Sequence, residues 1–123
     1  MKLFDFFKGK KEEREPTREK YWSLSTSDGE IVDPTIKQIE QVVKNATSNI
    51  SLFATLAYNY SGLEIESVQT ISNEGFYRFE ALTTNGKMYV KNDIDYDEAL
   101  ELFKQFYKHQ RVSRFKTWLV EKY

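Results

Sequence analysis

Apolar and polar residues alternate through the middle of the chain, from about residue 50 to residue 90. A period of two is typical of strands with one buried and one solvated face. The phase slips near Ser67-Val68, which indicates a β-bulge. Turn residues punctuate the pattern, and Asn85-Gly86 is a strong hairpin signal. We therefore predict four consecutive strands joined by tight turns, which forces antiparallel pairing.

The same alternation assigns side chains to the core. The predicted core-facing residues are Ile50, Leu52, Ala54, Leu56 and Tyr58, then Tyr77, Phe79 and Ala81, and finally Met88 and Val90. A shorter alternation over residues 21–25 predicts one more strand before the first helix.

Apolar residues at helical spacing predict helices on both sides of these strands. The first begins with Asp33 as N-cap and Pro34 at the first helical position, and runs to about Asn45. The second follows Asp95 and loses its apolar phase near residues 109–111, where we predict a break. A short third helix is predicted to carry Val112, Phe115, Trp118 and Leu119.

The predicted order is β-α-β-β-β-β-α-α. It describes an α+β domain in which an antiparallel sheet of about four to five strands carries its helices on one face. Residues 21–123 form this single domain, and residues 1–20 are a Phe-rich start followed by a charged linker. A chain of 123 residues is the usual size of one domain.

The N-terminal segment has a short apolar stretch, interrupted by Asp5 and followed by charge. It lacks the apolar length and cleavage site of a signal peptide, so we expect a cytoplasmic protein. Its large apolar side chains either dock on the domain or belong to a loose tail; an interfacial membrane anchor assisted by nearby lysines is the other interpretation. They are Leu3, Phe4, Phe6 and Phe7.

Charge is unevenly distributed, although the net charge is only -1. Residues 21–98 carry a net charge of -7, and residues 99–123 carry +4. Such asymmetry can mark a partner surface. The absence of cysteine excludes thiolate metal sites, disulfides and thiol catalysis.

Three aspartates and a glutamate crowd the six positions from Asp93 to Glu98. A calcium loop requires a glycine at its sharp turn and a glutamate at its twelfth position, where this chain has Lys104. A helix start accounts for the same residues, with Asp95 as N-cap, Glu98 completing a capping box and Asp97 favoured by the helix dipole. We predict a helix start, with no metal and no cofactor.

Catalytic signatures are weak throughout. His109 is the single histidine, no serine occupies a G-x-S-x-G elbow, and the five glycines do not cluster. Two of the strand glutamates Glu64, Glu66 and Glu80 would suit a small hydrolase if they faced each other, but a solvated sheet face predicts the same pattern. We expect a protein that is not an enzyme.

The C-terminal stretch interleaves basic and aromatic residues, as nucleic-acid binders do. Its aromatics lie on stripes that a core would use, and the sequence pI of 5.9 is low for such a protein. A nucleic-acid or membrane-surface accessory protein remains an alternative. It would use Lys104, Lys108, Arg111, Arg114 and Lys116.

From Trp22 to Glu121, the chain resembles small bacterial immunity proteins of polymorphic toxin and contact-dependent inhibition systems. The resemblance rests on short motifs: Trp22-Ser-Leu, the Pro34 helix with Ile36 and Ile39, Val68-Gln69, Tyr77-Arg-Phe-Glu80, the helix from Glu98 to Tyr107, and Trp118-Leu-Val-Glu121. The Phe- and Lys-rich start falls outside it.

The resemblance implies a non-enzymatic protein that binds a cognate toxin and blocks it. Nuclease toxins present basic surfaces, which an acidic partner can both approach and cover. The candidate contact residues are Asp28, Glu30, Glu64, Glu66, Glu74, Asp93 and Asp97.

Overall fold

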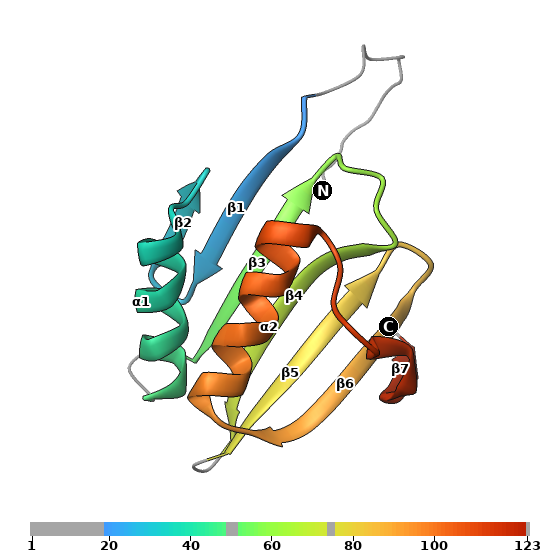
Figure 1. The fold of residues 1–123 in the computed structure, drawn as a ribbon. Helices are drawn as coiled ribbons and strands as arrows, with labels where there is room; N and C mark the ends of the chain where they lie inside the picture. The colour runs from blue at the N-terminus through green and yellow to red at the C-terminus, as the bar shows by residue number, and fades with distance from the viewer. Residues whose placement is uncertain (1–18, 49–51, 74–75, 123) are drawn as a thin grey trace.

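An open seven-stranded antiparallel sheet carries two helices on one face (Figure 1). The structure is a computed structural model that describes residues 19–48, 52–73 and 76–122. The strand order is β2-β1-β3-β4-β5-β6-β7. The strands are β1 (Tyr21–Thr26), β2 (Gly29–Val32), β3 (Phe53–Asn59), β4 (Ile65–Asn73), β5 (Phe76–Thr83), β6 (Lys87–Ile94) and β7 (Leu119–Lys122). The helices are α1 (Ile36–Thr47), α2 (Tyr96–His109) and the 3-10 turn η1 (Phe115–Thr117).

The α+β class with an antiparallel sheet is confirmed, but the predicted strand number was too low and the element order was wrong. The sheet has two edge strands that were not predicted, β2 and β7. The predicted third helix is instead η1 followed by β7. Because β6 offers an open edge, a chain returning beside it gains backbone hydrogen bonds there, as β7 does.

Helix α1 starts later than predicted. Thr35, not Asp33, is the N-cap: its hydroxyl accepts the Gln38 N–H at 3.2 Å, and the Gln38 Oε1 accepts the Thr35 N–H at 2.9 Å. Asp33 has φ 51° and accepts the Trp22 N–H through Oδ1 at 3.3 Å. This aspartate therefore ties the chain to β1 before the helix begins.

The predicted start and end of α2 are confirmed. Asp95 is its N-cap, with Oδ1 accepting the Glu98 N–H at 2.9 Å. The helix ends at His109, followed by Gln110 in the left-handed conformation at φ 56°. Its apolar side, with Phe103 and Phe106, is fully buried against the sheet.

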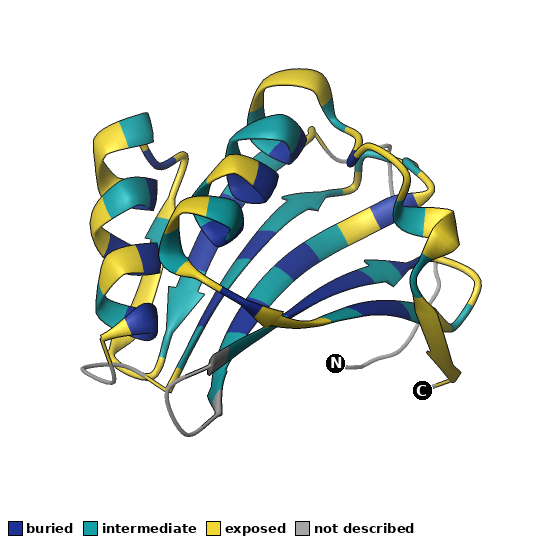
Figure 2. Ribbon diagram, turned by 60° about the horizontal axis from the view of Figure 1, so that its bottom comes forward, coloured by how far each residue is buried: buried dark blue, intermediate teal, exposed yellow. Residues whose placement is uncertain are grey.

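Both helices cover the same face of the sheet, which we call the helix face; the other is the helix-free face (Figure 2). The main core lies under the helices, where Leu24, Leu56, Val68 and Phe79 are fully buried. The predicted alternation of Tyr77, Phe79 and Ala81 toward the core is confirmed by the cluster they join. In β3 only Ala54, Leu56 and Tyr58 join it; Leu52 is exposed and Ile50 lies outside the described residues.

Met88 and Val90 were assigned to the wrong face. The register pairs Ala81 with Tyr89, so Tyr89 points to the helix face and its two neighbours to the helix-free face. The cause is the uninterrupted apolar run Met88-Tyr89-Val90. Because all three residues are apolar, the sequence pattern does not indicate which of them faces the helices. The predicted bulge in β4 is confirmed between Ile65 and Ser67.

Candidate functional site

The acidic residues predicted to contact a partner do not form one cluster. Asp28 lies in the turn between β1 and β2, and Glu30 follows on the edge strand β2. Asp93 and Asp97 lie where β6 passes into α2. Because β3, β4 and β5 separate β1 from β6, these two strands are four strand spacings apart, about 19 Å at about 4.8 Å per spacing.

Two further predicted residues lie at the opposite end of the sheet, where β4 begins (Figure 1). The Glu64 carboxylate forms an ion pair with Lys116 Nζ at 3.0 Å. Glu66 is exposed in the bulged start of β4. Glu74 lies outside the described residues. The structure therefore offers two acidic ends instead of one continuous acidic surface.

The β6–α2 junction is an acidic bend with an irregular backbone. Strand β6 has one extra residue between the positions of Lys91 and Ile94 that pair with β5. Asp93 lies in this bulge with φ 58°, in the left-handed region. The Glu98 carboxylate forms an ion pair with Lys91 and so does not close a reciprocal capping box with Asp95.

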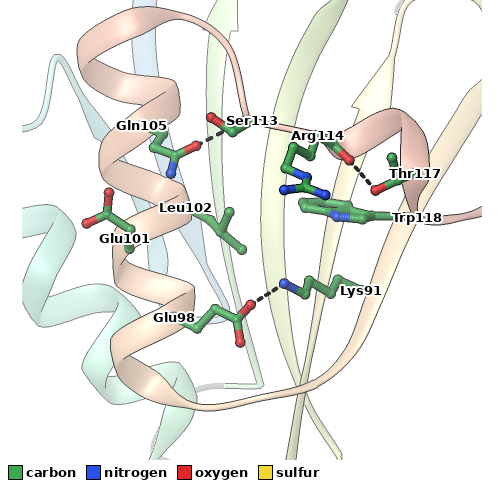
Figure 3. Close-up of a pocket in the computed structure, with 9 residues that line it drawn as sticks. All are labelled: Lys91, Glu98, Glu101, Leu102, Gln105, Ser113, Arg114, Thr117 and Trp118. Atoms are coloured by element: carbon green, nitrogen blue, oxygen red, sulfur yellow. Dashed lines mark hydrogen bonds and ion pairs between the residues drawn. The ribbon is translucent and has the colours of Figure 1, made fainter.

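A cleft of about 540 Å³ opens between α2, β6 and the segment before β7 (Figure 3). Gln105 Oε1 accepts the Ser113 N–H at 3.0 Å and fastens that segment to α2. The Trp118 ring meets the buried Phe79 ring edge-on at 5.7 Å, which fixes the aromatic wall. The lining residues are Lys91, Glu98, Glu101, Leu102, Gln105, Ser113, Arg114, Thr117 and Trp118.

The cleft lining carries two basic and two acidic side chains, and among the described residues one ion pair joins a basic and an acidic member of the lining. Lys91 pairs with Glu98 and also lies 5.9 Å from the centroid of the Trp118 ring. Glu101 is exposed and makes no ion pair with the described residues. It follows Asp97 by one helical turn, so two unpaired carboxylates share one side of α2. The sequence interpretation missed Glu101, although its spacing from Asp97 carried the signal.

A polar ladder crosses the helix-free face of the central strands. Thr55 Oγ1 donates to Gln69 Oε1 at 2.8 Å, and Gln69 Nε2 donates to the Glu80 carboxylate. Arg78 Nε donates to Glu80 Oε2 at 2.7 Å, and its Nη2 donates to Glu121 Oε1 at 2.7 Å. The ladder thereby ties β3, β4, β5 and β7 together by side chains.

Arg78 is the charge that makes this ladder favourable. Partial burial lowers the pKa of Arg78, but hydrogen bonds to Glu121 and Glu80 outweigh that effect, and the net pKa is raised. The Glu80 side chain is only 6% exposed, so its carboxylate depends on the bound guanidinium and amide. The arrangement is a satisfied structural network.

The predicted carboxylate pair of a hydrolase is not brought together by this register. Gln69 lies opposite Glu80 on β4, while Glu64 is paired with Lys116 at the end of the sheet. His109 is exposed at the end of α2. Among the described residues, no three His, Cys, Asp or Glu side chains gather where they could hold a metal ion.

The basic residues of the C-terminal stretch are divided between ion pairs and separate surfaces. Lys104 pairs with Glu40 at 3.1 Å, and Lys116 pairs with Glu64. Arg114 lines the cleft with its backbone at φ 63°. The third helix that was expected to present several of these residues is replaced by η1 and β7.

Comparison of the chain with protein-family models, with curated proteins and with solved structures finds no match. In the part of the chain that the structure describes, no helix has both the length and the apolar character needed to cross a membrane.

Proposed function

We propose that this chain is a non-enzymatic binding protein that neutralises a cognate bacterial toxin by direct contact, as its resemblance to immunity proteins implies. The observation that supports this is the difference between carboxylates that form ion pairs within the fold and carboxylates that do not. Asp93 and Asp97 lie at the β6–α2 junction, and Glu101 lines the cleft beside it. All three are exposed and make no ion pair with the described residues. By contrast, Glu64 and Glu80 are neutralised by basic side chains within the fold.

An unpaired carboxylate group beside an aromatic wall suits a basic partner. Lysine and arginine side chains bind both carboxylates and the face of a tryptophan ring. A basic side chain of the toxin would enter the cleft between Glu101 and Trp118, while Asp93 and Asp97 attract the surrounding positive surface. The cleft then holds the anchor, and the acidic bend provides the rim.

The local charge arrangement is unfavourable for the free protein. Like charges four residues apart on a helix destabilise it by about 0.2–0.5 kcal/mol, which applies to Asp97 and Glu101. A lysine at position 101 would turn the repulsion into a favourable pair with Asp97. The variant Glu101→Lys should therefore fold at least as stably as the parent protein while losing affinity for a basic partner.

The test uses, as the candidate toxin, the protein encoded by the gene that neighbours the gene for this protein. Growth rescue on co-expression and the dissociation constant of the purified pair are measured for the parent protein, Glu101→Lys and Glu66→Lys. Glu66→Lys is the matched control, because it makes the same charge change at the other end of the sheet, at an exposed residue that forms no ion pair with the part of the chain that the structure describes.

We expect the parent protein to rescue growth, Glu101→Lys to bind at least about tenfold more weakly, and Glu66→Lys to bind within about twofold of the parent. Failure of the parent protein both to rescue growth and to form a complex would overturn toxin neutralisation. A complex that tolerates Glu101→Lys but not Glu66→Lys would place the contact at the other acidic end.

A further inference from the structure

The helix-free face of the sheet carries large apolar side chains in register. Phe53 pairs with Ile71 across β3 and β4, and Leu82 pairs with Met88 across β5 and β6. Alternation along each strand points these four side chains away from α1 and α2. A sheet face that met only water would be expected to carry polar residues at these positions.

Burial on this face is concentrated at its centre. Val90 is 1% exposed and Glu80 is 4% exposed, and the register pairs these two residues on β6 and β5. At the margins, Leu119 on β7 is 62% exposed and Val32 on β2 is 58% exposed. Yet no described helix or strand lies over the helix-free face (Figure 2). The centre of this face is therefore much less exposed than its margins, and no described element covers its apolar side chains.

The N-terminal segment of this chain has the composition and reach to cover this face. Residues 1–18 lie outside the described residues, and apart from Met1 their large apolar side chains fall within residues 3–7. The described chain begins at Glu19, two residues before β1. Strand β5 is three spacings away from β1, about 14 Å, whereas the eleven residues 8–18 can extend over about 36 Å.

We infer that residues 3–7 dock on the helix-free face and cover Val90 and the polar ladder. Four large apolar side chains, three of them phenylalanines, supply an apolar cover for the apolar side chains of this face. The ladder beneath them can be covered because Glu80 already receives hydrogen bonds from Gln69 and Arg78. The occupant is thus a segment of the same chain.

Cysteine labelling tests this placement directly, because the chain has no cysteine of its own. The variant Val90→Cys is made in the full chain and in a chain that also carries Phe4→Ser, Phe6→Ser and Phe7→Ser. Reaction with a soluble thiol reagent should be at least about tenfold faster in the second chain, since exposure controls thiol access. Leu119→Cys, at the exposed margin, is the control and should react equally fast in both chains.

A second measurement leaves the phenylalanines intact. A nitroxide on Lys8→Cys should broaden the methyl resonance of Met88, which is one of only two methionines in the chain. Equal labelling of Val90→Cys in both chains, together with a sharp Met88 resonance, would overturn the inference. If the protection of Val90→Cys depends on protein concentration, a second copy of the chain covers this face. If the protection is lost when the chain binds added phosphatidylglycerol vesicles, the segment binds a membrane. Either result would also overturn the inference.

Discussion

Arg78 holds the polar ladder together, and replacing it by methionine should destabilise the protein strongly. Its side chain is 27% exposed, while that of its partner Glu80 is 6% exposed. Removing one partner of a buried ion pair costs about 3–5 kcal/mol, because the other charge stays buried and unpaired. Since water reaches part of Arg78, we expect about 2–3 kcal/mol for Arg78→Met.

The conservative change at Glu80 should cost much less, because the ladder can reverse its direction. In Glu80→Gln, the new Oε1 accepts from Arg78 and the new amide donates to Gln69 Oε1. Gln69 then turns its own amide toward the Thr55 hydroxyl, which accepts as readily as it donates. Only the charge is lost, and we expect a loss of about 1 kcal/mol.

Urea unfolding followed by circular dichroism measures these free energies by linear extrapolation. For a chain of this size, each kcal/mol corresponds to a shift of about 4 °C in Tm. The double variant Arg78→Met/Glu80→Met should be less destabilised than the sum of its single changes by at least about 1 kcal/mol, because it leaves no buried charge unpaired, while Glu121 is half exposed. A loss below about 1 kcal/mol for Arg78→Met, or strict additivity, would refute the reasoning.

Three further predictions concern single residues. Thr70 Oγ1 is buried without a hydrogen-bond partner among the described residues, so Thr70→Val should raise the free energy of unfolding by about 1 kcal/mol; a lower urea midpoint would contradict this. Asp95→Ala should lower the free energy of unfolding by about 1 kcal/mol because it removes the α2 cap, whereas Asp95→Ser should retain most of the capping energy. Thermal melts measure the difference, and equal Tm values for the two variants would be inconsistent with capping. Asp93→Gly should stabilise the bulge by up to about 1 kcal/mol, because glycine adopts the left-handed conformation without strain, while Asp93→Ala should not; a stabilised Asp93→Ala would count against strain.

The helix signals in the sequence were reliable where capping chemistry and apolar spacing agreed. The α2 boundaries followed from Asp95 and from the loss of phase near residue 110. The segment after it was misassigned because Phe115 and Trp118 are spaced like helix residues, yet they pack against Tyr89 and Phe79 of the sheet. Tertiary contacts and the open edge of β6 decided the local conformation, and neither is visible in the local pattern.

The two edge strands show a second limit. Strands β2 and β7 have four residues each, and β7 is exposed along its whole length, so neither displays an alternation long enough to detect. Their presence depends on the backbone groups of β1 and β6 that they satisfy.

The candidate site was foreseen in part. The acidic character of the β6–α2 junction is visible in the sequence, but its relation to Trp118 and Arg114 depends on the return of the chain after α2. The burial of Glu80 was also missed, because an acidic residue alternating with apolar ones looks solvated. Only the register that places Gln69 and Arg78 beside it shows why a buried carboxylate is tolerated.

The strand order also determines how the sheet can assemble. Strands β3, β4, β5 and β6 are neighbours both in the chain and in space, and short connections join them. Closing a short loop costs less conformational entropy than closing a long one, so this four-stranded meander is the part that can nucleate folding. The β1–β2 hairpin can pair with β3 only when the connection through α1 has closed, and β7 can pair with β6 only when the connection through α2 has closed. The Gln69–Glu80–Arg78 portion of the ladder lies wholly within this meander, whereas Glu121 joins it from β7, which lies outside the meander and follows α2 in the chain.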